Sequence, residues 1–144
     1  MTASLKIAIG QLGAIAGDII GSVHEFSCGK TTEFSLFAAR SSWTDDSALT
    51  VAVAEHLLRG GDLVDLFHRA VREHPGAGWG GMFLRWAGRR DREAYGSFGN
   101  GSAMRVSPVG FAFSTAAQTL AAAALTAEVT HNHPEGIKGA QATA

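Results

Sequence analysis

The sequence has 144 residues, enough for one domain with its own hydrophobic core, and we expect a single domain over residues 1–144. Apolar residues make up 46% of it and charged residues 17%, which excludes a disordered chain. The net charge of −1 and the lack of a basic stripe argue against nucleic acid as the main partner. Cys28 is the only cysteine, so no internal disulfide can form and we expect a reducing, cytoplasmic location.

The first apolar segment, Leu5–Gly21, resembles the core of a short signal peptide, but its glycines and Asp18 argue against that interpretation. It is also short and interrupted for a membrane span, so we expect no membrane partner and predict a buried helix. Its glycines recur every three or four residues and share one helical stripe: Gly10, Gly13, Gly17 and Gly21. Such a stripe indicates close approach either of another helix, in simple packing, or of a ligand.

Two acids near this segment are candidates for a site. Asp18 lies close to the C-terminal end of the predicted helix, where the helix dipole disfavours an acid. Glu25 follows in the loop. Both acids can be structural, or both can face the same pocket as the acidic pair Asp45 and Asp46.

That pair lies in the stretch Ser42–Ser47, where a loop turns into a helix with Thr44 or Asp45 as the expected N-cap. One carboxylate is enough for a cap and for a favourable charge at the helix N-terminus. Two acids and a hydroxyl on one turn also supply three oxygen ligands of the kind that Mg²⁺ or Mn²⁺ prefers. The residues alone leave both interpretations open.

The rest of the chain predicts further helices and no strand, which makes the fold class all-α. Typical helix-ending and helix-starting residues mark these elements. They are the stop at Gly60–Gly61, the cap Asp62 of a third helix, the short amphipathic helix Met82–Ala87, the capping box of Thr115 and Gln118 for a helix over Ser114–Thr130, and Pro134 at the start of a last helix over Glu135–Ala144. The run Gly76–Gly81 matches a dinucleotide-binding pattern but follows a helix, so we exclude that function.

The segment Gly96–Arg105 is rich in glycine and is predicted to run into a helix opened by Ser102, which Ser107–Pro108 then breaks. Free backbone N–H groups in such a loop can hold an anion such as a phosphate. A flexible linker is the alternative, but Phe98 and Asn100 between the glycines favour a binding loop.

Two histidines, His131 and His133, follow the predicted helix over Ser114–Thr130. A pair separated by one residue can ligate a metal ion. Hydrogen bonding at a helix terminus is the more ordinary role for such histidines.

Four stretches together resemble the ADP-ribosylglycohydrolase family, in the family's order and over nearly the whole chain. They are Gly13–Ser22 with Glu25, Thr44–Ser47, Gly99–Pro108 and Thr130–Gly136. The resemblance implies an all-α orthogonal bundle of helices. It also implies a metal-dependent hydrolase that cleaves the glycosidic bond between ADP-ribose and an acceptor such as an arginine side chain. The partner is then an ADP-ribosylated protein or another ADP-ribose conjugate.

The same resemblance assigns residues to roles. Thr44, Asp45 and Asp46 would bind Mg²⁺ or Mn²⁺ in a two-metal centre, and Glu25 would be the carboxylate beside the scissile bond, with Asp18 supporting it. Glu25, Asp45 and Asp46 would form the catalytic set. The ADP-ribose cleft would be lined by Gly99, Asn100, Gly101, Ser102, His131 and His133.

The chain departs from the family at its C-terminal end. A later Asp-x-Asp-Thr cluster supplies the other metal ligands in the family, whereas this chain has no acid after Glu135. The alternative function is therefore a catalytically inactive ADP-ribose-binding remnant that lacks the second half of the metal site. We expect a truncated bundle whose uncovered apolar surface favours a homo-oligomer or a completing chain.

Overall fold

The protein is described here by a computed structural model that covers residues 2–26 and 29–144, so Cys28 lies outside the described residues. These residues form helices and contain no strand, which confirms the all-α fold class. The elements are α1 (Ala3–Gly21), α2 (Asp45–Arg59), α3 (Leu63–Glu73), α4 (Gly81–Arg89), the 3₁₀ turn η1 (Asn100–Ser102), α5 (Ser107–Ala112), α6 (Ala116–Glu128) and α7 (Pro134–Thr143).

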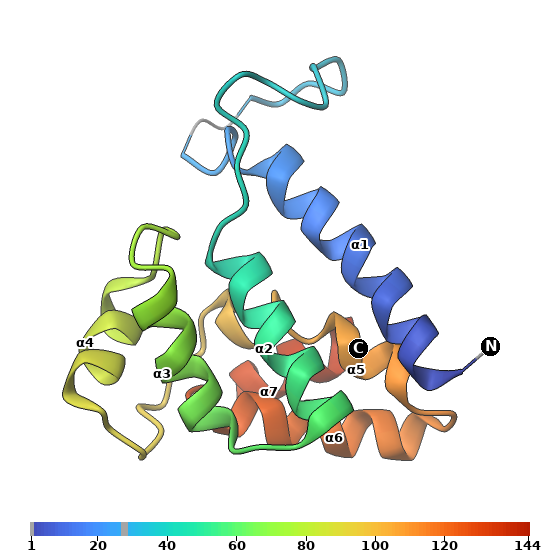
Figure 1. Cartoon of the computed structure of the whole chain (residues 1–144), viewed down its shortest axis with the longest axis vertical. Coiled ribbons are helices and arrows are strands. Elements are labelled where there is room, and N and C mark those ends of the chain that lie inside the picture. The colour runs from blue at the N-terminus through green and yellow to red at the C-terminus, as the bar shows by residue number, and fades with distance from the viewer. Residues whose placement is uncertain (1, 27–28) are drawn as a thin grey trace.

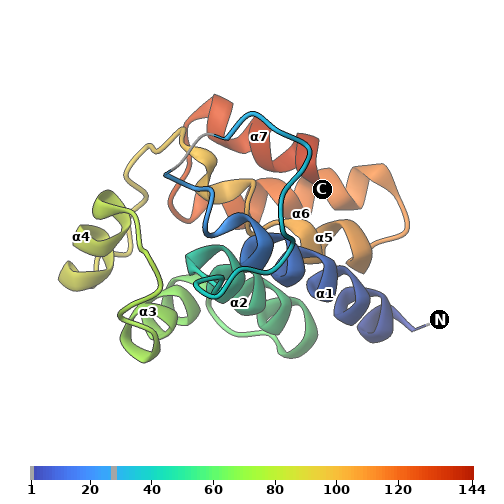
Figure 2. The ribbon, with the colours of Figure 1, turned by 90° about the horizontal axis from the view of Figure 1, so that it is seen from above.

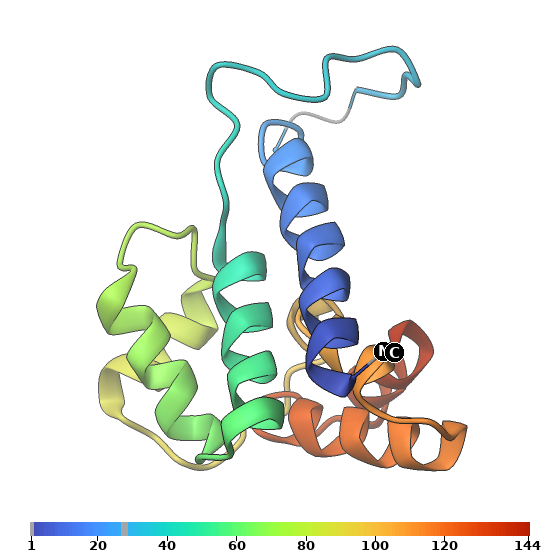
Figure 3. The same cartoon turned by 45° about the vertical axis from the view of Figure 1, so that its right-hand side comes forward.

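Helix α2 lies at the centre of the bundle and packs against α1, α3 and α5 (Figure 1). Figure 3 shows α1 and α2 side by side and antiparallel, with α6 running across their lower ends, which is the expected orthogonal arrangement. Seen from above in Figure 2, α3 and α4 lie on one side of α2, while α5, α6 and α7 lie on the other. The core between them is built from fully buried residues such as Val53, Phe67, Val106 and Val109.

Local capping chemistry sets most of the helix ends as predicted. Thr44 is the N-cap of α2, where its side chain accepts a hydrogen bond from the Asp46 N–H. Asp62 caps α3 and Thr115 caps α6 in the same way. Helix α2 ends at Gly60, which has a φ of +78°, a conformation that glycine adopts without strain.

The prediction around Ser102 and Ser107–Pro108 is wrong. Ser102 opens no α-helix but ends the short turn η1, and its hydroxyl donates to the Gly136 carbonyl at 2.7 Å. The helix begins at Ser107 instead, with Pro108 in its first turn. A proline breaks a helix interior, but in the first turn its missing N–H has no intrahelical partner to lose.

The prediction that the first helix is buried is also wrong. Its side chains Leu5, Ile9 and Leu12 are 51%, 50% and 69% exposed. The reason is that α1 packs mainly against α2 and α5, which leaves its opposite side open. By length and composition the segment Ser4–Gly21 is long and apolar enough to cross a membrane, contrary to our expectation, although a long apolar helix of a bundle meets the same criterion.

The glycine stripe of α1 reflects close packing at one position. A Cβ atom placed on Gly10 would lie 2.2 Å from the Phe111 ring of α5. At Gly13, Gly17 and Gly21 the same construction meets no atom of the described residues within 4 Å. Simple helix packing therefore accounts for Gly10, and no described residue approaches the Cβ position of the other three.

This difference predicts opposite effects for two substitutions in the same helix. Gly10→Ala should lower the free energy of unfolding by about 1–3 kcal/mol, because the methyl group displaces the Phe111 ring. Gly13→Ala should raise it by about 0.5–1 kcal/mol, because alanine is the better helix former. Urea unfolding of both variants measures the contrast, and equal effects would contradict the packing described here.

Candidate functional site

The carboxylate of Asp18 joins the end of α1 to the beginning of α2. Its Oδ2 atom accepts hydrogen bonds from the Thr44 N–H at 2.7 Å, the Ser47 N–H at 3.2 Å and the Ser47 hydroxyl at 2.5 Å. Its Oδ1 atom accepts from the Thr44 hydroxyl at 2.6 Å. An acid that is unfavourable at the C-terminal end of its own helix is thus stabilised by the positive N-terminal end of another helix.

This contact fixes where the neighbouring acids Asp45 and Asp46 project. Both lie in the first turn of α2, and the Asp45 N–H donates to the Ala77 carbonyl at 2.7 Å. The loop that follows Ala77 is thereby held against the helix start. Gly78, with a φ of +88°, is the next residue of that loop and lies beside the Asp45 carboxylate.

Glu25, Asp45 and Asp46 line one cleft with a volume of about 400 Å³. The structure therefore brings Glu25 to the same cleft as Asp45 and Asp46, whereas Asp18, which we had considered together with Glu25, is not among its lining residues. The cleft also contains Gly99, Asn100 and Gly101 of the glycine-rich loop, together with His131. Residues far apart in the sequence meet here because α2, the glycine-rich loop and the segment after α6 converge on the same space.

Burial and nearby negative charges raise the pKa values of Asp45 and Asp46. Burial raises the pKa of Asp45 to about 7, and the negative charges of Asp46, Glu25 and Asp18 act in the same direction. Burial and the charges of Asp18 and Glu25 also raise the pKa of Asp46, while its hydrogen bond with Thr44 opposes the shift. None of the ion pairs in the described part of the chain involves these acids.

The oxygen atoms of the acids in this cleft are chemically suited to bind a hard divalent cation. They are carboxylate oxygens whose mutual repulsion a positive ion would relieve. The Thr44 hydroxyl adjoins Asp46 at 3.4 Å but also serves as the cap of α2. Over residues 2–26 and 29–144, no group of three or more His, Cys, Asp or Glu side chains has the spacing of a metal site. The ligand set Thr44, Asp45 and Asp46 therefore stays a prediction.

The remaining predicted binding residues divide into two groups. Gly99, Asn100, Gly101 and His131 line the cleft, whereas Ser102 and His133 are not among its lining residues. Ser102 is buried against Gly136 as described above. The ring of the exposed His133 accepts a hydrogen bond from the Glu135 N–H and so caps α7, which is the ordinary histidine role considered from the sequence.

Several residues that line the cleft were not predicted. Tyr95, Arg105 and Phe83 contribute side chains, and Gly78, Gly80 and Gly81 contribute backbone. The glycine run Gly76–Gly81 was a signal, since glycines often let a ligand approach the backbone, but we considered it only as a dinucleotide-binding pattern and excluded that function. Arg105 stands in the stretch that carries the family resemblance, yet nothing in the local pattern indicates that its side chain is buried.

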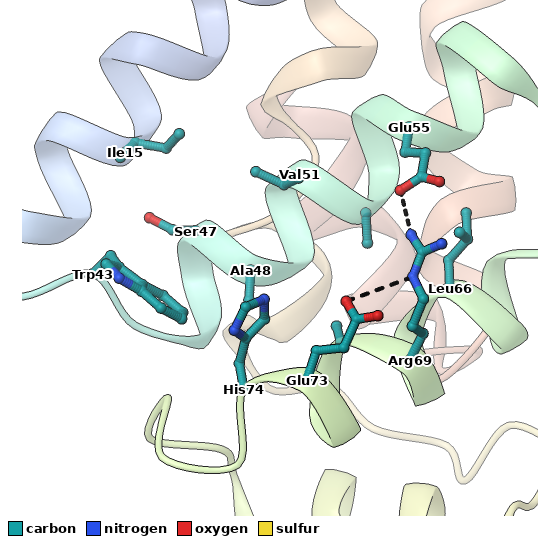
Figure 4. A pocket seen from close by; sticks show the side chains of 12 residues that line it. Ile15, Trp43, Ser47, Ala48, Val51, Glu55, Leu66, Arg69, Glu73 and His74 are labelled. Atoms are coloured by element: carbon teal, nitrogen blue, oxygen red, sulfur yellow. Dashed lines mark hydrogen bonds and ion pairs between the residues drawn. The ribbon is translucent and has the colours of Figure 1, made fainter.

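A second cleft, of about 390 Å³, lies on another side of α2, between α1 and α3 (Figure 4). Trp43 stands edge-on to His74 at one end, and Arg69 pairs with Glu55 and Glu73 at the other. None of the predicted catalytic, metal-binding or substrate-binding residues lines this cleft. The predicted catalytic residues Glu25, Asp45 and Asp46 line the first cleft instead, whereas the predicted metal ligand Thr44 is not among its lining residues.

The raised pKa of Asp45 predicts a pH dependence of stability in the metal-free protein. Folded Asp45 keeps its proton up to about pH 7, whereas an unfolded aspartate loses it near pH 4. The folded state then binds more protons over this range, so the free energy of unfolding falls as the pH rises from about 4 to 7. Asp45→Asn should remove this contribution, so that its stability relative to wild type increases across the same range.

Urea unfolding in the presence of a chelator, at several pH values between about 4 and 8, measures this difference. The exposed Asp91 offers a control, because it lies outside this cleft and Asp91→Asn leaves the Asp45 carboxyl in place. A flat difference for Asp45→Asn would argue against a buried, repelled carboxylate at this position.

Comparison with known proteins identifies the family of this chain. The family model described as ADP-ribosylglycohydrolase matches residues 5–144. ADP-ribosylhydrolase ARH3 of Mus musculus is 29% identical over an alignment that covers 89% of this chain and 44% of that protein. ARH3 of Homo sapiens is 32% identical over 89% of this chain and 45% of its own length. ARH3 of Bos taurus is 32% identical over 68% of this chain and 32% of its own length. The chain spans less than half the length of these relatives. Because the family match extends over most of its residues, the chain belongs to the ADP-ribosylglycohydrolase family.

Proposed function

We propose that this chain binds ADP-ribose conjugates and contributes to hydrolysis of their glycosidic bond. One observation carries the proposal: the acids Glu25, Asp45 and Asp46 share a cleft with the glycine-rich loop and His131. Family membership supports the class of reaction. The names of the relatives describe ADP-ribosylhydrolases, which supports the same class of substrate.

The acids suit a reaction that builds positive charge on a sugar. Cleavage of a glycosidic bond passes through an oxocarbenium-like state, which nearby carboxylates stabilise. Glu25, at the exposed rim of the cleft, would take the proton of the attacking water as general base or give one to the leaving group as general acid. Asp45 and Asp46, with Thr44, would hold Mg²⁺ or Mn²⁺. That ion would supply charge to orient the ribose hydroxyls.

The pyrophosphate of the ligand would lie at the glycine-rich loop. Backbone N–H groups around Gly99 and Gly101 would bind the pyrophosphate, as glycine-rich loops commonly do. Arg105 lines the same cleft and adds a buried positive charge. An ADP-ribose conjugate would place its pyrophosphate at the glycine-rich loop and its scissile bond at the acids Glu25, Asp45 and Asp46.

The same charge distribution supports arginine as the acceptor residue. A guanidinium leaving group carries positive charge, and the acids Glu25, Asp45 and Asp46 attract it. An ADP-ribosylated protein modified on arginine is therefore the substrate that we propose.

A binding role without catalysis is the second candidate. It is favoured by the lack, in the described part of the chain, of a group of three or more His, Cys, Asp or Glu side chains with metal-site spacing. A divalent ion held by Asp45 and Asp46 alone would keep most of its hydration shell and bind weakly. The chain would then retain ADP-ribose without cleaving it.

We also propose that the chain associates with a second copy through α1. The exposed side chains Leu5, Ile9 and Leu12 form an apolar stripe along that helix, and covering it would be favourable. Sizing in solution tests this, since a monomer at all concentrations would contradict it.

Catalysis predicts Mg²⁺-dependent release of ADP-ribose from ADP-ribosyl-arginine. Glu25→Gln should lower the rate by roughly 10²–10⁴-fold, the range for loss of a general acid or base. Asp45→Asn should abolish the dependence on Mg²⁺. Glu55→Gln is the matched control, because Glu55 lies on the same helix as Asp45 but lines the other cleft, and it should leave the rate unchanged.

The two candidate functions are separated by a parallel measurement of thermal unfolding. ADP-ribose should raise the melting temperature if the cleft binds it. A raised melting temperature without turnover would favour the binding role, and neither effect at millimolar ligand would contradict both.

A further inference from the structure

A positively charged side chain is buried at the inner end of the cleft. Arg105 has no exposed surface, and its guanidinium lies 4.4 Å from the centre of the Phe67 ring. Burial lowers its pKa to about 9, so the group is still charged at neutral pH. Its Nε and Nη1 atoms have no hydrogen-bond partner among the described residues. Burying a charged group with unpaired hydrogen-bond donors lowers stability. We therefore infer that Arg105 has a role beyond packing.

The Nη2 atom of Arg105 connects this charge to the segment after α6. It donates to the Thr126 carbonyl and to the Thr130 hydroxyl oxygen, both at 2.9 Å. Thr130 is fully buried, and its hydroxyl oxygen lies 2.8 Å from Nδ1 of His131. A continuous chain of hydrogen bonds therefore runs from Arg105 through Thr130 to the histidine that lines the cleft.

The direction of these hydrogen bonds follows from which groups can donate. A guanidinium only donates, so the Thr130 oxygen accepts from Arg105 and keeps one proton to give. The nearby positive charge favours a lone pair over an N–H group at Nδ1 of His131. Burial raises the pKa of the Tyr95 phenol, against the opposing effects of the Arg105 charge and of its hydrogen bond with Thr130, so the phenol stays protonated and is itself a donor.

We propose that Arg105 and Thr130 are positioning residues that hold His131 as the neutral imidazole with its proton on Nε2. His131 then offers the cleft a hydrogen-bond donor, suited to a phosphate or hydroxyl oxygen of the ligand. The identity of that ligand as ADP-ribose rests on the function proposed above. The state of the ring does not, because the hydrogen bonds that set it lie within the chain.

Two further features hold the ring in this state. Burial, together with the Arg105 charge, lowers the pKa of His131 to about 4, so the ring stays neutral at physiological pH. The ring also packs directly on Gly101, where an added Cβ would lie 2.8 Å from Cε1 and 3.0 Å from Nε2 of the imidazole. The glycine at this position lets Nε2 lie against the backbone of the binding loop.

Nuclear magnetic resonance of ¹⁵N-labelled histidine tests the proposal directly on the whole chain without ligand. The chain has six histidines, and loss of one signal set in His131→Gln assigns the residue. Wild type should show the Nε2–H tautomer and no protonation from about pH 8 down to about pH 5. A wild-type ring with the proton on Nδ1, or a ring protonated in this range, would overturn the proposal.

Substitutions at Thr130 test the connection to Arg105. Thr130→Val keeps the shape but removes the hydroxyl, and it should give a mixture of tautomers. Thr130→Ser keeps the hydroxyl and should restore the wild-type spectrum. A pure Nε2–H tautomer in Thr130→Val would overturn the role of Thr130.

Calorimetric titration with ADP-ribose measures the consequence for binding. Thr130→Val should weaken affinity on the order of tenfold, as expected for one misdirected hydrogen bond, and Thr130→Ser should bind like wild type. Equal affinities for all three proteins would overturn the role in binding. If wild type does not bind ADP-ribose at all, the proposed function fails, while the spectra still decide the tautomer.

Discussion

The cleft depends on the contact between Asp18 and the beginning of α2. An acid in the last turn of a helix is opposed by the dipole of that helix, but Asp18 faces the positive end of α2 and accepts hydrogen bonds from Thr44 and Ser47. This contact fixes two antiparallel helices at the point where the chain must present Asp45 and Asp46. Packing elsewhere in the bundle supports the two helices, but this contact orients their ends.

The cleft combines acids and a buried cation that come from different parts of the fold. Asp45 and Asp46 come from α2, and Arg105 and His131 come from the second half of the chain. Burial makes each charge costly, and the shifted pKa values of Asp45 and Arg105 express that cost. The anionic part of a ligand would offset the buried charge of Arg105. A sugar that carries developing positive charge would offset the negative charge of Asp45. The charges that line the cleft thus support the substrate class proposed above.

The parts of the fold that depend on local chemistry could be predicted from the sequence. Caps at Thr44, Asp62 and Thr115 act within one helical turn, so their sequence signals suffice. The exposure of α1 and the helix start at Ser107 could not be predicted in this way, because they depend on which elements pack beside them. In the cleft, the acids and the glycine-rich loop could be proposed as binding residues from their residue types. The buried network of Arg105 and Thr130 was missed, since it forms only when distant segments meet.

We propose that Asp18 orients α2 so that Asp45 and Asp46 face one cleft and hold a divalent ion. Titration of Mn²⁺ into wild type and Asp18→Asn, followed by electron paramagnetic resonance, tests this role of Asp18. Wild type should bind Mn²⁺, and Asp18→Asn should bind it on the order of tenfold more weakly, although Asp18 is not a proposed ligand. Mn²⁺ affinity that is the same in both proteins, or no binding by wild type, would contradict the proposal.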